Sequence, residues 1–222
     1  MEDTNLIKRT ISFVKETLKN AEGGHDWFHI ERVFRTARII SKEEKVDATV
    51  VELAALLHDI ADPKFHNGDE EIGPETAQNF MESEEIDKDV VVHVVSIIKQ
   101  MSFKNSLETK TNTFSSKELQ VVQDADRLDA LGAIGIARAF NYGGYKNRPL
   151  YNPDVPPKFN MSKEEYKNTK GPTINHFYEK LLLLKDKMNT ETGKKLAIKR
   201  HEFMLTFLEQ FKNEWESLEP ID

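Results

Sequence analysis

The sequence predicts an all-α protein, a helical bundle of roughly eight or more helices in a single domain with one long irregular segment. Apolar residues recur at steps of three and four through most of the chain, as they do on one face of an α-helix. Residues that cap helix N-termini precede several of these stretches, and no stretch shows a convincing strand pattern. With 222 residues, 38% of them hydrophobic, the chain can bury a full core.

The first half of the chain divides into five expected helices. The third of them is apolar nearly all round, which is typical of a central buried helix. Pro63 is expected to end it. We expect helices at 7–18, after the cap Asp26 through Ile40, at 50–60 after the cap Asp47, around 75–81, and after the cap Asp87 through Met101.

The second half begins with a polar loop and a further expected helix from about Lys117 to Phe140. Residues 141–172 are rich in Gly, Pro, Tyr, Lys and Arg, and Gly143 and Gly144 are expected to break any regular element there. A loop of this length in a compact domain is usually functional. The predicted organisation is therefore a helical core at 1–140, an irregular loop or lid at 141–172, and C-terminal helices at 173–222 that pack on the same domain.

Charge and composition exclude several classes of protein. The formal net charge of -7 disfavours sequence-independent binding of a nucleic acid polymer, whose phosphates attract cationic proteins. The chain has no cysteine, so any metal must be held by histidine and carboxylate. No run approaches the roughly 20 apolar residues of a membrane-spanning helix, and the N-terminus lacks the apolar stretch of a signal peptide. A cytoplasmic location is expected by elimination.

Histidine and aspartate occur at positions that the helical pattern places toward the core. His29 lies one turn before Val33, and Asp126 is four residues from both Val122 and Ala130. The sequence Leu-Leu-His-Asp-Ile at 56–60 places a further histidine and acid in an apolar helix. An unpaired carboxylate in an apolar interior is costly, so these acids require a partner. One divalent cation would offset both acids and accept the imidazole lone pairs, with Mn²⁺, Fe²⁺, Co²⁺, Ni²⁺ or Mg²⁺ as candidates.

Three segments around these residues resemble the HD superfamily of metal-dependent phosphohydrolases over about the first 140 residues. They are Phe-His-Ile-Glu-Arg-Val at 28–33, Leu-Leu-His-Asp-Ile-Ala-Asp at 56–62 and Gln-Asp-Ala-Asp-Arg-Leu-Asp at 123–129. The resemblance implies an HD-domain helical core and a metal site. The implied metal ligands are His29, His58, Asp59 and Asp126.

Other segments resemble the bacterial YpgQ-like branch of this superfamily: Ser-Phe-Lys at 102–104, Ala-Ile-Gly-Ile-Ala-Arg at 133–138 and Arg-Pro-Leu-Tyr-Asn-Pro at 148–153. The resemblance to that branch implies that the protein hydrolyses (deoxy)nucleoside triphosphates to monophosphate and pyrophosphate with manganese. Two-metal members of the superfamily carry further histidines where this chain has Lys99, Gln100 and Met101, so a single metal ion is favoured. His93, earlier in the same helix, is a weaker candidate for contact with the site.

The candidate catalytic residues are Asp62 and Asp59. Asp62 is the better candidate for the base, because it lies one turn beyond the His58–Asp59 pair if the helix continues to Pro63. An equally weighted interpretation has Asp62 interacting only with the following loop. Anionic substrates need cationic neighbours, and Arg32 and Lys64 adjoin the motifs most closely. The full set of candidate substrate-binding cations is Arg32, Lys64, Lys104, Lys146 and Arg148, and Tyr142, Tyr145 and Tyr151 could contact a nucleobase.

The expected partner is a small phosphorylated molecule, with a nucleotide as the first choice. Two alternatives remain open: a phosphomonoesterase of the 5'-nucleotidase type that acts on nucleoside monophosphates, and a non-catalytic helical module stabilised by metal. An oxygenase on the same scaffold would need two irons and more histidines than the chain offers between Asp59 and Asp126. The sequence does not fix the oligomeric state, and a homodimer is compatible with it.

Overall fold

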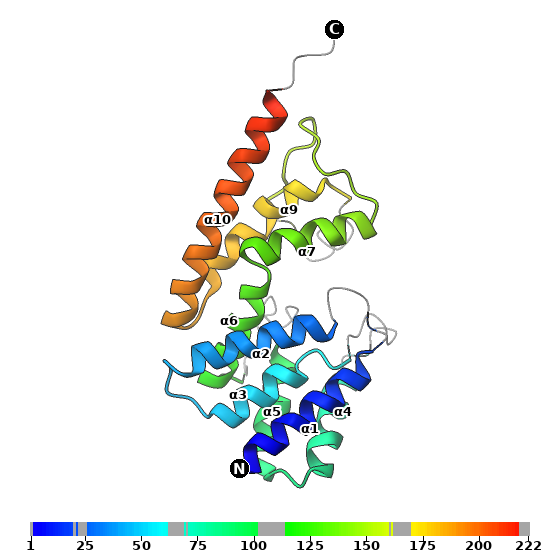
Figure 1. Cartoon of the computed structure of the whole chain (residues 1–222), viewed down its shortest axis with the longest axis vertical. Helices are drawn as coiled ribbons and strands as arrows, with labels where there is room; N and C mark the ends of the chain where they lie inside the picture. Colours follow the sequence, from blue (N-terminus) through cyan, green and yellow to red (C-terminus); the bar gives the residue numbers. More distant parts are fainter. Residues whose placement is uncertain are drawn as a thin grey trace. The chain divides into compact units, whose positions relative to one another are not determined.

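The computed structural model describes residues 2–19, 21, 26–61, 69, 71–101, 114–159, 161 and 170–217. Within these residues the chain forms nine α-helices and one 3₁₀-helix and contains no strand, which confirms the all-α class (Figure 1). The helices are α1 (Glu2–Thr17), α2 (Trp27–Ser41), α3 (Ala48–Leu57), α4 (Ile72–Ser83), α5 (Lys88–Met101), α6 (Lys117–Asp129), α7 (Gly132–Tyr145), α9 (Thr173–Glu179), the 3₁₀-helix η3 (Leu181–Lys187) and α10 (Glu191–Glu216).

Contacts within the chain define two compact units, Met1–Asp126 and Arg127–Asp222. The first contains α1 to α5 and most of α6; the second contains the end of α6 and all later helices. The organisation expected from the sequence, with divisions at 140 and 172, stays a prediction.

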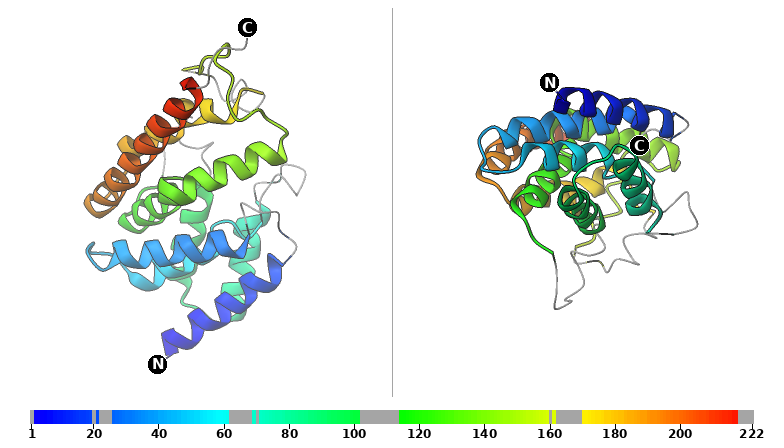
Figure 2. Two further views of the ribbon diagram at one scale, coloured as in Figure 1. Left: turned by 45° about the horizontal axis from the view of Figure 1, so that its top comes forward. Right: turned by 90° about the horizontal axis from the view of Figure 1, so that it is seen from below.

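Helix α3 forms the centre of the first unit, as its apolar sequence predicts. All of its residues from Val50 to Leu57 except Glu52 are buried, and the helix packs against α1, α2 and α5. Helices α2 and α3 lie side by side (Figure 2). The predicted caps of both helices are confirmed, because the carboxylates of Asp26 and Asp47 accept hydrogen bonds from backbone N–H groups in the first turn.

The end of α3 differs from the prediction. The helix stops at Leu57, with His58 as its C-terminal cap, and a tight turn follows in which the Ile60 N–H donates to the Leu57 carbonyl over 3.3 Å. The helix therefore does not continue to Pro63, so the spacing argument for Asp62 does not hold. The apolar sequence through Ile60 concealed this end, since Ile60 stays buried after the helix has finished.

The helix expected from Lys117 to Phe140 is two helices. Helix α6 ends at Asp129, Leu131 is extended, and Gly132 opens α7 with a φ of 72° that favours glycine. Helix α7 then runs to Tyr145, so the prediction that Gly143 and Gly144 break regular structure was wrong. A Cβ on Gly143 would lie 2.1 Å from the Thr173 Oγ1. Close packing against α9 therefore accounts for this glycine.

In the second unit, α10 packs against both α7 and η3, and α9 packs against η3 (Figure 2). The buried face of α10 consists of Gly193, Ala197, Met204 and Leu208. Phe203 on the same helix is exposed although it is apolar. No helix among the described residues is long and apolar enough to span a membrane.

Candidate metal centre

His29 lies in the first turn of α2 and points into the protein. The carboxylate of Asp26 accepts a hydrogen bond from the His29 backbone N–H over 3.0 Å, which fixes the start of the helix. Ile30 and Val33, on the same side of α2, are fully buried, and the His29 side chain is only 2% exposed. The local sequence thus places an imidazole inside the first unit, as predicted.

His58 is held by the end of α3. Its Nδ1 lies 3.0 Å from the Ala55 carbonyl oxygen. A carbonyl oxygen can only accept, so Nδ1 carries the proton and the Nε2 lone pair is available for a cation. This arrangement, in which a backbone carbonyl orients the ring, is the usual support of a metal-binding histidine.

Asp126 on α6 faces both imidazoles. Its Oδ1 lies 3.5 Å from the His29 Nε2 and 4.0 Å from the His58 Nε2. The two imidazole rings meet edge to face with their centroids 5.5 Å apart. Residues separated by nearly a hundred positions in the sequence therefore converge on one point in the first unit.

A divalent ion fits these three side chains. One ligand atom from each of His29, His58 and Asp126 lies within 4.8 Å of the others. Ligand atoms bound at about 2.1 Å to one ion are separated by roughly 3 to 4.2 Å, so small side-chain movements suffice. Two neutral imidazoles and one carboxylate also suit borderline divalent cations, and three protein ligands leave positions for water or substrate.

The fourth predicted ligand, Asp59, lies in the turn that follows α3 and is partly exposed. It is outside the group of side chains whose atoms are close enough to share an ion. Its role as a ligand stays a prediction. The predicted catalytic acid Asp62 and the predicted cations Lys64 and Lys104 lie outside the described residues.

The burial of α6 differs from the prediction. Asp126 was expected to be buried, but its side chain is 39% exposed. The fully buried acid of this helix is Asp124, two residues earlier, and Asp129 is also buried. The partial exposure of Asp126 agrees with access of water or substrate to the candidate metal centre, which a catalytic metal site needs.

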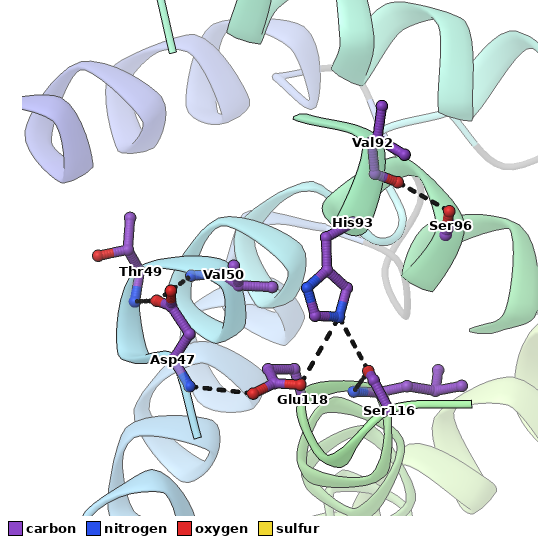
Figure 3. A network of polar contacts seen from close by, with 9 residues as sticks. Asp47, Thr49, Val50, Val92, His93, Ser96, Ser116 and Glu118 are labelled. Atoms are coloured by element: carbon purple, nitrogen blue, oxygen red, sulfur yellow. Dashed lines mark hydrogen bonds and ion pairs between the residues drawn. The ribbon is translucent and has the colours of Figure 1, made fainter. Parts of the chain in front are cut away.

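His93 contacts the start of α6. Its Nε2 lies 3.0 Å from the Ser116 Oγ and 3.6 Å from a carboxylate oxygen of Glu118 (Figure 3). His93 is absent from the described side chains that could share an ion with His29 and His58. These contacts favour a structural role, which is the stronger of the two interpretations of its sequence position.

Three of the predicted substrate-binding cations are described. Arg32 lies on α2, one turn beyond His29. Lys146 and Arg148 follow α7, where the Lys146 Nζ lies 4.6 Å from the ring centroid of Tyr145 and the Arg148 guanidinium lies 5.6 Å from that of Tyr142. The second unit therefore presents cations and exposed aromatic rings together at this end of α7.

The second unit also contains a histidine that sequence spacing did not single out. His176 on α9 is largely buried, and the cations Lys180 and Arg148 add to the effect of burial. Together they lower the pKa of His176 to about 4, because both influences disfavour the imidazolium. Asp129 is buried in this unit too, where its Oδ2 accepts a hydrogen bond from Arg138 over 2.6 Å.

Comparison with known proteins places the chain in a family. A family model described as "HD domain" matches residues 27–131, which include His29, His58 and Asp126. The chain is also 36% identical to the Bacillus subtilis protein YpgQ, over 96% of each sequence. The chain therefore belongs to the HD-domain family, and at the level of that family it is a metal-dependent phosphohydrolase.

Solved structures agree with this assignment. An HD-superfamily hydrolase from Bacillus thuringiensis is 42% identical to the chain, with a TM-score of 0.78, and the match covers 97% of this chain and 100% of that one. The structure of Bacillus subtilis YpgQ in complex with ADP is 36% identical, with a TM-score of 0.76 and coverage of 96% and 97%. These similarities extend over both units of the chain.

Proposed function

We propose that the protein hydrolyses (deoxy)nucleoside triphosphates to nucleoside monophosphate and pyrophosphate with one divalent ion, Mn²⁺ as the first candidate. His29, His58, Asp59 and Asp126 would hold the ion. The observation that carries this proposal is the approach of the Asp126 Oδ1 to both imidazoles, at 3.5 Å and 4.0 Å, in a partly open position. A carboxylate beside two imidazole nitrogens is a favourable environment for a cation.

The choice of a nucleotide rests on two further points. YpgQ, 36% identical over nearly the whole chain, has been crystallised in complex with ADP. Tyr142 and Tyr145 in the last turn of α7 also lie close to Lys146 and Arg148, which follow it, and together they offer ring faces for a base and cations for phosphates.

In the proposed reaction, water attacks the α-phosphorus of the triphosphate and pyrophosphate departs with the bond electrons. When bound, a divalent ion would polarise a phosphate oxygen and acidify water. His58 would keep its proton on Nδ1, held by the Ala55 carbonyl, and present Nε2. Because the 56–62 segment resembles the HD superfamily, Asp62 stays the proposed base: it would orient the attacking water and accept its proton.

Cationic side chains would stabilise the negative charge that increases on the leaving pyrophosphate. Arg32 is the first proposed contact, and its position one turn from His29 on the same helix supports this choice. Lys64, Lys104, Lys146 and Arg148 are the further proposed contacts. Each should affect the Michaelis constant for triphosphate more than the binding of the metal ion.

A metal-by-substrate screen tests the proposal. Purified protein would be assayed with Mn²⁺, Mg²⁺, Fe²⁺, Co²⁺ and Ni²⁺ against nucleoside mono-, di- and triphosphates, with pyrophosphate and orthophosphate measured separately. Pyrophosphate released from triphosphates supports the proposal. Orthophosphate released from monophosphates would instead identify a 5'-nucleotidase, and metal-dependent stabilisation without any hydrolysis would identify a structural metal.

The role of Asp62 needs its own variant. Asp62→Ala should retain the metal ion but lose about 10²-fold to 10⁴-fold in kcat, the usual contribution of a positioned acid or base. Metal affinity measured by calorimetry serves as the control for an intact site. Unchanged turnover with metal retained would remove Asp62 from the mechanism.

A further inference from the structure

Glu118 joins two helices that carry candidate metal ligands. It lies in the first turn of α6, the helix of Asp126. Its Oε1 accepts a hydrogen bond over 3.0 Å from the backbone N–H of Asp47 (Figure 3). Asp47 is the N-terminal cap of α3, and His58 is the C-terminal cap of the same helix. The Asp47 carboxylate in turn accepts from the N–H groups of Thr49 and Val50, over 2.9 Å and 3.2 Å. The start of α3 is therefore bonded directly to the start of α6.

The other oxygen of Glu118 faces α5. Oε2 lies 3.6 Å from the His93 Nε2, and the same nitrogen lies 3.0 Å from the Ser116 Oγ. Ser116 caps α6 by accepting from the Leu119 N–H over 3.1 Å. The Glu118 side chain is only 14% exposed, whereas its hydrogen bond to Asp47 lies at an exposed stretch of backbone. Glu118 thus connects the first turn of α6 to α3 and to α5 at the same time.

These contacts lie at one end of the two helices, and the candidate ligands lie toward the other end. At about 1.5 Å per residue, His58 is roughly 16 Å along the chain direction from Asp47, and Asp126 is roughly 12 Å from Glu118. Helices of this length transmit a shift at one end to the other, because their backbone hydrogen bonds resist deformation. A displacement of α6 against α3 at Glu118 would therefore change the distance between Asp126 and His58.

We propose that Glu118 is a positioning residue for the metal centre: by accepting from the Asp47 N–H it holds α6 in register with α3, and so holds Asp126 opposite His58. The inference rests on the proposed metal-dependent function. It assigns to Glu118 an effect on metal affinity that a merely stabilising contact elsewhere in the first unit would lack.

Three variants test this role. Glu118→Ala removes both contacts, whereas Glu118→Gln keeps a carbonyl oxygen that can accept from the Asp47 N–H. The matched control is Glu84→Ala, because Glu84 is similarly shielded, at 20% exposure, and pairs with Arg9 across α1 and the end of α4, which carry no candidate ligand. The dissociation constant for Mn²⁺ is measured by calorimetry, and the free energy of unfolding of the metal-free protein is measured in urea.

We expect Glu118→Ala to weaken Mn²⁺ binding about tenfold, as the loss of a supporting contact commonly does, while Glu118→Gln stays within about threefold of wild type. Glu84→Ala should lower stability and leave Mn²⁺ affinity within about twofold. The role is overturned if Glu118→Ala keeps wild-type affinity, if Glu118→Gln loses as much as Glu118→Ala, or if Glu84→Ala loses as much as either. If the wild-type protein binds no Mn²⁺, the proposed function is overturned together with the role of Glu118. If the wild type binds Mn²⁺ and only the variants deviate from expectation, the role of Glu118 alone is overturned.

Discussion

The two units of the chain each remove a histidine from solvent, but they surround it with charges of opposite sign. In the first unit, His29 lies beside the Asp126 carboxylate and a second imidazole. In the second, His176 lies near Lys180 and Arg148, and its pKa falls to about 4. Burial alone therefore does not distinguish a candidate ligand from a neutral core histidine. The sign of the neighbouring charges does, because a carboxylate favours a cation at the imidazoles and nearby cations oppose one.

The largest expected effect follows from removing the negative charge of Asp126 in the first unit. Asp126→Asn keeps the shape of the side chain but removes its charge, so Mn²⁺ affinity should fall by more than the 10- to 100-fold that is typical for outer-shell partners. Turnover of triphosphate should fall about 10³-fold or more, as direct participation in the site implies. Calorimetry and a pyrophosphate assay measure the two quantities. Asp89→Asn, at an exposed position in the first turn of α5, is the control and should change neither.

An intermediate effect is expected from the histidine of the second unit. Since the pKa of His176 falls from 6.5 to about 4 on folding, the unfolded chain binds more protons between these pH values. The contribution of His176 is fully present above pH 6.5 and is lost as the pH falls toward 4, by about 3 kcal/mol at most. Urea unfolding at several pH values should therefore show a steeper acid loss in wild type than in His176→Gln.

Equal slopes for wild type and His176→Gln between pH 6.5 and 4 would contradict this assignment. The contrast drawn between His29 and His176 would then fail, because His176 would no longer be a buried imidazole kept neutral by its surroundings. The metal affinity of His176→Gln, measured at pH 7.5, should equal that of wild type.

The smallest expected effect concerns the hydroxyl of Thr173, a buried polar group in the second unit. The Oγ1 of Thr173 is buried and has no hydrogen-bond partner among the described residues. Thr173→Val replaces this hydroxyl by a methyl group of similar size, so the free energy of unfolding should be unchanged or rise by up to about 1 kcal/mol. A loss above 1 kcal/mol would show that the hydroxyl is hydrogen-bonded. His58 provides the contrast, because the bond from its Nδ1 to Ala55 leaves Nε2 directed at Asp126.

The parts of the site that short-range sequence signals specify were predicted. Asp26 and Asp47 cap α2 and α3 as expected, and the apolar spacing of α2 places His29 inside. A capping carboxylate and one helical face are local properties, so a single sequence suffices to identify them.

The errors arose where packing between helices decides the outcome. The apolar period runs without interruption across Leu131, so the break that the positive φ of Gly132 permits was not visible. Gly143 lies inside a helix, and its lack of a side chain reflects the close approach of Thr173, a residue thirty positions away, rather than a break in regular structure. In α6 Asp124 and Asp129 are buried and Asp126 is partly exposed, because the orientation of a helix with several acids depends on its neighbours.

The residue that caps the end of α3, His58, combines a structural contact and a proposed metal-binding role in one side chain. A helix leaves the carbonyls of its last turn without intrahelical partners, and the His58 Nδ1–H supplies one of them with a donor. The same ring would bind the cation through Nε2. Replacing His58 by a residue that cannot donate to Ala55 would therefore fray the end of α3 even in metal-free protein. At this position a loss of activity is inseparable from a loss of helix stability, whereas at Asp126, whose carboxylate faces the two imidazoles, the two can be measured apart.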